Sequence, residues 1–329
     1  MEKAKAKALR FEEFGKPEEV LNLVEIDVRD PAEGEVVLEM ERSALHPSDL
    51  GIIGGSYGRL PDLPAIAGRE GVGRAIQVGA NVPADAVGKR FYLSSGGVWS
   101  SRKVASFEDL VEVPEGVPSD QAALAGVNPT TAFLLLENFA NLKPGDWVVQ
   151  NAANSAVGVA VVQLCRSRGI HTANLVRRKE LFAPMESIGA DVVVLDDREA
   201  PEKISAEIGS DPVPLGLNSV GGPSVLNLAK VVSDHGTVVT FGGMTGEKIR
   251  FPTRQLIFND IRFAGFWMDR WNRVHGEGDR KELLGRVFQA IEDGSLKTQV
   301  EAVYPLEKCH DALEHNASGR MGKVLFGDV

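Results

Sequence analysis

The chain has 329 residues, with 36 Lys and Arg against 46 Asp and Glu, so its formal net charge is −10. At roughly 100–200 residues per domain, this length predicts two domains that each bury a core. The 43% hydrophobic and 25% charged residues exclude a disordered, collagen-like or coiled-coil chain. The acidic balance argues against nucleic acid as a partner, because phosphate neutralisation needs a basic surface.

The number of cysteines limits which cellular compartment and which metal sites are compatible with the chain. Cys165 and Cys309 are too few for a disulfide framework or for a zinc site of four cysteines, and they fit a reducing compartment. The first residues are charged and lack an apolar signal region, and no window approaches the ~18 apolar residues of a membrane span. We therefore expect a cytoplasmic protein with no membrane partner.

The first ~120 residues contain short β-type runs between turn residues, which favour an irregular antiparallel barrel or sandwich. The clearest runs are 36–41, 71–78 and 111–113. A helix is then expected over 129–142, because Pro129 suits a first helical position and apolar residues follow at helical spacing.

After this helix, strands and helices alternate, which predicts a doubly wound parallel sheet. Two helices and one strand should follow this sheet. Pro184 predicts a kink or a shorter helix where it falls. The expected strands are 147–150, 172–176, 192–195, 215–220, 237–241, 261–266 and 323–326, and the expected helices are 156–168, 179–188, 279–293 and 306–316.

A turn of small residues, 151–158, joins the first strand of this sheet to a helix. Small residues let the backbone approach a pyrophosphate, and the helix N-terminus offers N–H groups and a positive dipole. Of the G-x-G-x-x-G pattern only Gly158 is present, with Ala153 and Ser155 in the other two places. The turn predicts a dinucleotide site, and a tight connection with no ligand is the alternative.

The end of the second strand indicates which dinucleotide is bound. Sites for NAD usually carry an acid about 20 residues after the turn, whereas this chain has Arg177 and Arg178 there. Guanidinium groups pair with a 2′-phosphate, which a carboxylate would repel. We therefore expect NADPH as the cofactor; the alternative is that the basic cluster only aids solubility.

Two glycine pairs follow later strands of the same sheet, and ligands of open sheets bind at such carboxyl ends. Together with the first turn they predict one crevice, with Gly243 and Met244 near the nicotinamide. The pairs are Gly221-Gly222 and Gly242-Gly243.

The chain resembles the medium-chain dehydrogenase/reductase superfamily and, within it, the mitochondrial-type 2-enoyl thioester reductases. Quinone oxidoreductases are more distant relatives. The matching stretches are 47–49, 55–61, 126–129, 150–158, 218–222, 241–244 and 265–271.

The resemblance implies a Rossmann domain inserted in a GroES-like barrel domain, with the active site in the cleft and homodimers paired through the Rossmann sheets. The implied segments are 1–125 and 265–329 for the GroES-like catalytic domain and 126–264 for the NADP-binding domain. The residues it implies for cofactor binding are Asn154, Ser155, Ala156, Val157, Gly158, Arg177, Arg178, Val220, Gly221, Gly242, Gly243, Met244, Phe266, Trp267 and Lys323.

The resemblance also bears on zinc. Zinc alcohol dehydrogenases of the superfamily have Cys where this chain has His46 and His where it has Arg69, and they add a lobe with four cysteines. Arginine at a ligand position and two cysteines elsewhere cannot hold tetrahedral zinc, so we expect no metal. The zinc-free reductases commonly have Asn at position 46. His46 is therefore either a hydrogen-bonded loop residue or one with a direct role.

Without a metal, reduction of an α,β-unsaturated thioester needs a proton donor for the α-carbon and hydrogen bonds to the carbonyl oxygen. Tyr57 is the candidate donor, because it is the one tyrosine of three that lies in a glycine-rich loop. A purely structural loop tyrosine is the alternative.

Four further residues are placed near the nicotinamide or substrate by the resemblance. Asn128 and Thr131 are expected to be hydrogen-bonding neighbours there, with a helix N-cap role as the alternative for Asn128. Trp267 and Trp271 stand at i, i+4, and the alternative for them is core packing.

The expected function is NADPH-dependent reduction of the C=C bond of a 2-enoyl thioester, an activity of lipid metabolism. NADPH-dependent reduction of a quinone or free alkenal uses the same fold and is the main alternative. A non-catalytic NADPH-binding protein is the third reading. It would keep the turn and Arg177 but would not need Tyr57.

Overall fold

The computed structural model describes residues 4–318 and 321–328. The chain divides into two compact units, which are described separately. Unit 1 comprises Met1–Val127, Glu277–Asp293 and Lys297–Val329, and unit 2 comprises Asn128–Gly276 and Gly294–Leu296.

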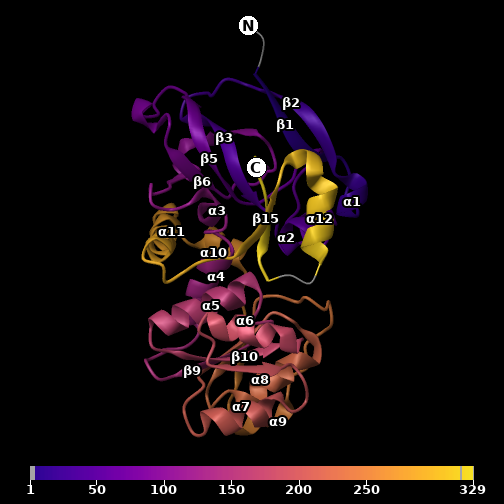
Figure 1. Ribbon diagram of the computed structural model, residues 1–329, viewed down its shortest axis with the longest axis vertical. Coiled ribbons are helices and arrows are strands. Elements are labelled where there is room, and N and C mark those ends of the chain that lie inside the picture. The colour runs from indigo at the N-terminus through magenta and orange to yellow at the C-terminus, as the bar shows by residue number, and fades with distance from the viewer. Residues whose placement is uncertain (1–3, 319–320, 329) are drawn as a thin grey trace. The chain divides into compact units, whose positions relative to one another are not determined.

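Unit 1 is built on two β-sheets (Figure 1). The larger has the order β15-β16-β3-β5-β6-β8, with β7 paired to β3, and the smaller has the order β2-β1-β4. Among the described residues, β15 and β16 pair in parallel and the other strands of unit 1 pair antiparallel. The strands are β1 (Ala4–Phe11), β2 (Asn22–Val28), β3 (Glu35–Ala44), β4 (Ala65–Ile66), β5 (Gly71–Val78), β6 (Arg90–Leu93), β7 (Arg102–Ser106), β8 (Val111–Glu112), β15 (Val300–Tyr304) and β16 (Lys323–Phe326).

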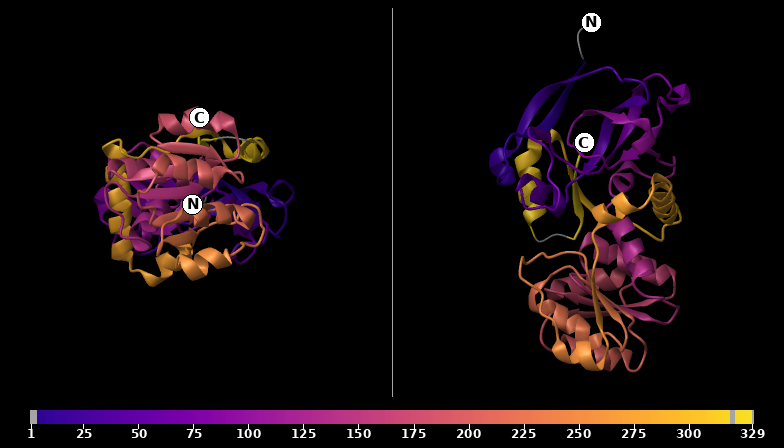
Figure 2. Two further views of the ribbon diagram at one scale, coloured as in Figure 1. Left: turned by 90° about the horizontal axis from the view of Figure 1, so that it is seen from below. Right: turned by 180° about the vertical axis from the view of Figure 1, so that it is seen from behind.

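The core of unit 1 joins the two ends of the chain. Trp99 is fully buried, packs edge-on against Phe326 of β16 at 4.8 Å, and donates its indole N–H to the Ala44 carbonyl at 2.9 Å. The C-terminal segment thus completes the sheet that the N-terminal strands begin, as the right view of Figure 2 shows. The helices are α1 (Pro17–Val20), α2 (Pro47–Ile53), α3 (Ser119–Ala122), α11 (Glu277–Glu292) and α12 (Cys309–Ala317), with 3₁₀ turns η1 (Ala84–Ala86), η2 (Phe107–Asp109) and η5 (Leu306–Lys308).

Unit 2 is a parallel sheet of order β11-β10-β9-β12-β13-β14, whose chain order reverses between β9 and β12. This is the doubly wound order whose ligand lies at the reversal. The central strands β9, β10 and β12 are buried on both faces, since α4 and α5 cover one face of the sheet and α7 and α8 the other (Figure 1). The strands are β9 (Trp147–Asn151), β10 (His171–Val176), β11 (Val192–Leu195), β12 (Leu215–Asn218), β13 (Thr237–Thr240) and β14 (Arg262–Gly265).

The helices of unit 2 differ in their bounds from those predicted from the sequence. The helix expected over 129–142 begins at Asn128 and ends at Asn138, and the one expected over 179–188 is a 3₁₀ turn followed by a short helix. Pro184 is the third residue of that short helix, where the missing N–H breaks no helical hydrogen bond. The helices are α4 (Asn128–Asn138), α5 (Ala156–Ser167), α6 (Phe182–Ser187), α7 (Ala200–Ile208), α8 (Val225–Val231), α9 (Thr253–Phe258) and α10 (Met268–Val274), with η3 (Lys179–Leu181) and η4 (Gly222–Ser224).

One of the two boundaries between the units lies close to the expected position, and the other lies later in the chain. Unit 1 gives way to unit 2 after Val127, close to the expected change at 125/126. The chain returns to unit 1 at Glu277, later than the expected change at 264/265, because Phe266 stacks edge-on with Phe139 of unit 2 and Met268 contacts Thr130. Among the described residues, no helix is long and apolar enough to cross a membrane.

Candidate functional site

The turn between β9 and α5 has the features that an approaching phosphate needs. An added Cβ on Gly158 would lie 2.4 Å from the Ala153 carbonyl oxygen, so only glycine lets the helix pack on the turn. Ser155 caps α5 by accepting the Gly158 N–H at 3.2 Å. Ala152 has a φ of +44°, a left-handed conformation that non-glycine residues rarely adopt. The strained turn at Ala152 therefore leads into the N-terminus of α5, where the sequence-predicted residues 154–158 lie.

Buried amides hold the carboxyl ends of β9, β12 and β13 together below this turn. Asn151 donates to Asn218 at 2.8 Å and to the Ser224 hydroxyl at 2.8 Å, and Asn218 donates to Thr240 at 3.1 Å. Asn218 in turn accepts the Gly221 N–H at 3.2 Å. No motif in the sequence singles out these side chains, although polar residues at the ends of apolar strands were the available signal.

Arg177 and Arg178 follow β10 directly and are both exposed. Leu175 of β10 pairs with Asn151 of β9, and Ala153 donates its N–H to the Leu175 carbonyl at 3.3 Å. The two arginines therefore leave the sheet at the same edge as the turn, on the neighbouring strand. This is the place where the second strand of a dinucleotide fold meets the ribose.

The two glycine pairs lie side by side. Met244 and Thr245 donate their N–H groups to the carbonyls of Ser219 and Val220, and an added Cβ on Gly242 would lie 3.1 Å from the Ser219 oxygen. The segments that hold Gly221 and Gly243 thus form one edge of unit 2, with Met244 largely exposed. The Ser219 hydroxyl is buried and has no hydrogen-bond partner among the described residues.

The residues predicted to lie near the nicotinamide form two groups within unit 2, one at the start of α4 and one directly after β14. Asn128 is the first residue of α4. Its amide nitrogen is buried without a hydrogen-bond partner in the described part of the chain, and Thr131 is buried one turn further on. Trp267 and Trp271 are only partly buried, which argues against core packing. Phe266 precedes them at the end of β14.

In unit 1, His46 lies at the centre of a buried polar cluster. Its Nε2 is 2.7 Å from Glu70 Oε1, and its Nδ1 is 3.2 Å from Lys323 Nζ. Glu70 also accepts the Tyr92 hydroxyl at 2.9 Å and the Gly126 N–H at 3.0 Å. Lys323, expected to bind the cofactor, donates from its Nζ to the Leu45 carbonyl at 2.8 Å. His46 is thus a hydrogen-bonded histidine of a network that the sequence did not reveal.

The donors in this cluster determine the state of the imidazole. An ammonium group has no acceptor, so Lys323 donates to Nδ1 and the proton of neutral His46 lies on Nε2, where it is donated to Glu70. Burial raises the pKa of Glu70 to about 7, although Tyr92, Gly126 and the charges of Lys323 and Arg69 oppose this shift. Burial likewise raises the pKa of Asp49, which accepts the His46 backbone N–H at 2.7 Å.

This donor set does not fit zinc. Both ring nitrogens of His46 are engaged, and a lysine ammonium lies beside one of them. The described residues contain no group of three or more His, Cys, Asp or Glu side chains that could hold a metal ion. Tetrahedral zinc needs several such ligands, and nearby cations oppose it.

Tyr57 lies in the loop after α2, and its ring is held on two sides. Its backbone N–H donates to the Gly51 carbonyl at 3.1 Å, and an added Cβ on Gly51 would lie 3.6 Å from the ring. The Arg69 guanidinium lies 5.1 Å from the ring centroid. The tyrosine is half-buried, so the loop presents it less freely than the sequence predicts.

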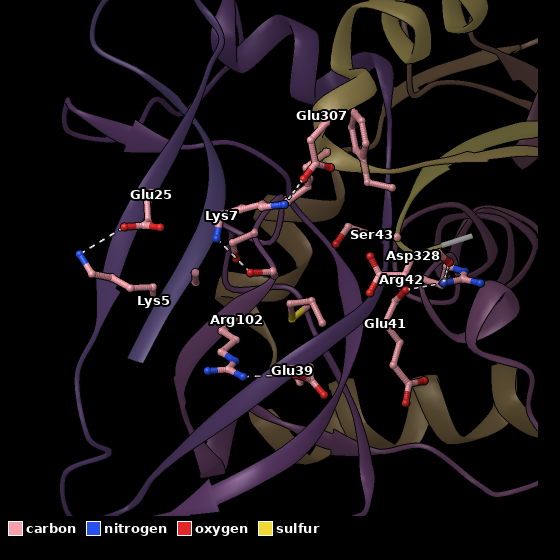
Figure 3. Close-up of a pocket in the computed structure, with 17 residues that line it drawn as sticks. Lys5, Lys7, Glu25, Glu39, Glu41, Arg42, Ser43, Arg102, Glu307 and Asp328 are labelled. Atoms are coloured by element: carbon pink, nitrogen blue, oxygen red, sulfur yellow. Dashed lines mark hydrogen bonds and ion pairs between the residues drawn. The ribbon is translucent and has the colours of Figure 1, made fainter. Parts of the chain in front are cut away.

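A groove of about 340 Å³ on unit 1 lies apart from these residues (Figure 3). Its walls carry many charges, but these pair with one another or with neighbours: Lys7 with Glu307, Lys5 with Glu25, and Arg102 with Glu39. None of the predicted site residues lines it. Because its charges already neutralise one another, we assign the chemistry to the sites above.

Comparison with known proteins agrees with this geometry. The alcohol dehydrogenase GroES-like domain matches residues 32–114, and the zinc-binding dehydrogenase domain matches residues 156–281. The mitochondrial enoyl-[acyl-carrier-protein] reductase of Xenopus tropicalis is 35% identical over 319 residues, covering 94% of this chain and 91% of the relative. The chain belongs to the enoyl reductases of the medium-chain dehydrogenase/reductase superfamily. The zinc in the name of one domain model does not extend to this member, whose donor set does not fit the metal.

Solved structures of enoyl reductases and of a quinone reductase candidate are similar over the whole chain. Etr1p, an enoyl thioester reductase of Candida tropicalis solved with NADP and crotonyl-CoA, is 26% identical with a TM-score of 0.91. A candidate NADPH:quinone reductase of Bacillus thuringiensis is 25% identical, also at 0.91. Each covers 99% of this chain and 100% of its own. The fold alone therefore does not distinguish the two substrates.

Proposed function

We propose that this enoyl reductase reduces the C=C bond of a 2-enoyl thioester with NADPH. The observation that carries the proposal is Tyr57, held in its glycine-rich loop between Gly51 and Arg69. The 35% identity to a mitochondrial enoyl-[acyl-carrier-protein] reductase supports it. A protein that only binds NADPH would have no use for this tyrosine.

The residues of unit 2 fit the cofactor. The strained turn and the N-terminus of α5 would hold the pyrophosphate through Asn154, Ser155 and the backbone N–H groups of Ala156 and Val157. Arg177 and Arg178 would hold the 2′-phosphate. Asn128 has a buried amide donor that suits the nicotinamide or the substrate carbonyl. Bound NADPH supplies the hydride that adds to the β-carbon.

Tyr57 then completes the reduction by protonating the α-carbon. The electron pair delocalised over the α-carbon and the thioester carbonyl forms the new C–H bond, while the O–H bond of Tyr57 breaks. The phenolate that results regains a proton from water. Hydrogen bonds to the thioester oxygen stabilise the negative charge until this proton arrives.

Changing both Arg177 and Arg178 to Met should weaken NADPH binding far more than NADH binding. Each charge-assisted bond to a phosphate is worth about 1.5–3 kcal/mol, so the Kd for NADPH should rise by about 10²-fold or more. Fluorescence titration of both cofactors measures the change. Arg166→Met, at the other end of α5, is the matched control. A wild type that binds the two cofactors equally would contradict the assignment.

Steady-state kinetics with three substrates tests the function itself. The proposal expects kcat/KM for crotonyl-CoA or a longer 2-enoyl-CoA to exceed that for a benzoquinone. A preference for the benzoquinone would favour the quinone reductase alternative, which the similar Bacillus thuringiensis structure supports. Tight NADPH binding without oxidation by any acceptor would favour a non-catalytic protein.

We also propose a homodimer paired through unit 2. Strand β14 lies at the edge of the sheet, and an exposed apolar patch lies beside it, where Phe251 stacks edge-on with Phe263 of β14. Phe251, Ile257 and Phe258 are 54%, 65% and 71% exposed, which is unusual for a surface that faces only water.

Changing Phe258 to Glu should convert the dimer to a monomer, because a charge on this patch would be buried against the second copy. Sedimentation velocity measures the mass of each form. Val87→Glu, an exposed apolar residue of unit 1, is the control and should leave the mass unchanged. A monomeric wild type would exclude the dimer.

We further propose a cytoplasmic location. Both cysteines are free, which suits a reducing compartment. The matched relatives are named as mitochondrial. Fractionation of cells that express the protein natively distinguishes these two locations.

A further inference from the structure

Arg69 is the residue that faces the ring of Tyr57. Its guanidinium carbon lies 5.1 Å from the ring centroid, within the range of a cation–π contact. Gly51 of α2 borders the same ring, and the Tyr57 N–H is bonded to the Gly51 carbonyl. The tyrosine is thus held by one backbone contact from α2 and one cationic contact from the segment before β5.

The backbone that carries Arg69 is held on both sides. An added Cβ on Gly68 would lie 2.2 Å from the ring of the buried Trp99, so the chain must pass close to the core just before Arg69. Glu70, directly after it, accepts hydrogen bonds from His46, Tyr92 and Gly126. Arg69 therefore extends from one of the most constrained points of unit 1.

The charges around Arg69 explain why a cation is retained there. Asp49 and Glu70 are both buried carboxyl groups, and the positive charges of Arg69 and Lys323 act on both of them. Two buried carboxyl groups and two cations thus lie around His46. Arg69 is the cation of this set that also contacts Tyr57.

We propose that Arg69 is a positioning residue for Tyr57, holding its ring over the guanidinium and stabilising the negative charge that the phenol oxygen acquires when its proton moves to the substrate. The inference rests on the proposed enoyl thioester reduction. It links the buried cluster around His46 to the reaction, because the cluster sets the position of Arg69 and Arg69 sets that of the tyrosine. His46 and Glu70 then act at a distance, through Arg69.

The test is a double-mutant cycle between Arg69 and Tyr57. Arg69→Met should lower kcat with crotonyl-CoA by about 3–30-fold, with the KM for NADPH unchanged. In the Tyr57→Phe background the same change should have no further effect, since the proton donor is already absent. Arg69→Lys, which keeps a cation, should recover most of the lost kcat. Arg59→Met, an exposed arginine of the same loop, is the matched control.

A second measurement does not depend on activity. The ¹³Cζ signal of Tyr57, assigned among the three tyrosines with Tyr57→Phe, should shift in Arg69→Met and stay in place in Arg59→Met. If the wild type reduces no enoyl thioester, the proposed function fails, whereas this signal still reports the contact. An unchanged signal, or an equal loss of kcat in both tyrosine backgrounds, would overturn the role of Arg69.

Discussion

Tyr57→Phe should lower kcat with crotonyl-CoA by about 10²–10⁴-fold, the range that a positioned general acid contributes. The change removes one oxygen from a ring that Gly51 and Arg69 hold in place, so the loop should keep its conformation. NADPH affinity should change little, because the residues that fit the cofactor lie in unit 2. Single-turnover oxidation of NADPH, followed by absorbance, measures the effect on the chemical step.

The matched control is Tyr304→Phe. It removes a hydroxyl that is bonded to His315 at 2.9 Å, and neither residue belongs to the proposed site. This variant should retain the wild-type kcat. Turnover by Tyr57→Phe at the level of this control would show that the proton reaches the α-carbon from another group.

The parallel sheet of unit 2 is the part of the fold that the sequence predicts best. Its central strands are buried on both faces, so they contain continuous apolar runs such as 147–149, and their ends carry glycine or small polar residues. The cofactor turn was predicted for the same reason, since Gly158 and its small neighbours are required by close packing. In this unit the amino-acid composition of each segment is therefore sufficient to predict its local structure.

The strand pairing of unit 1 was harder to predict than strands such as β16, which lies at the expected 323–326, because the pairing depends on distant partners. Strand β16 completes a sheet begun by β3, and β15 pairs in parallel with β16, a contact that no local pattern reveals. Helix α2 also escaped the sequence analysis. It is short, and its run of Gly51, Ile52 and Ile53 is equally typical of a strand or turn.

The buried cluster could not be predicted for a similar reason. His46, Glu70, Tyr92, Gly126 and Lys323 lie far apart in the chain, and each is unremarkable in its own segment. Arg69 was noted only as a residue that excludes zinc. Its contact with Tyr57 became visible once the loop after α2 and the segment before β5 were placed together.

Above pH 7, where Glu70 is ionised, replacing it by Ala should lower the free energy of unfolding by about 3–5 kcal/mol, the usual cost of removing one partner of a buried charged pair. The side chain is fully buried and accepts three hydrogen bonds, so its loss leaves the donors of His46, Tyr92 and Gly126 without an acceptor. The buried ammonium of Lys323 would also lose a nearby negative charge. Urea unfolding followed by circular dichroism measures the loss.

Glu112→Ala provides the matched control. Glu112 lies on β8, is exposed, and pairs with Lys89 at 3.3 Å, so its removal should cost no more than about 1 kcal/mol. If Glu70→Ala does not fold, Tyr92→Phe removes a single donor to the same carboxylate and should cost about 1–2 kcal/mol. A loss at Glu70 no larger than that at Glu112 would contradict the importance of the cluster.

The pH dependence of this stability follows from the raised pKa of Glu70. The folded protein holds a proton on Glu70 up to about pH 7, whereas the unfolded chain releases it near its ordinary value of 4.5. Its contribution to the free energy of unfolding is therefore fully present below pH 4.5 and is lost as the pH rises through about 7. In Glu70→Gln the side chain cannot ionise, so this decrease in the free energy of unfolding with rising pH should be absent. The wild type should thus lose up to about 3 kcal/mol relative to Glu70→Gln between these pH values, and a constant difference would show that Glu70 titrates at its ordinary pKa.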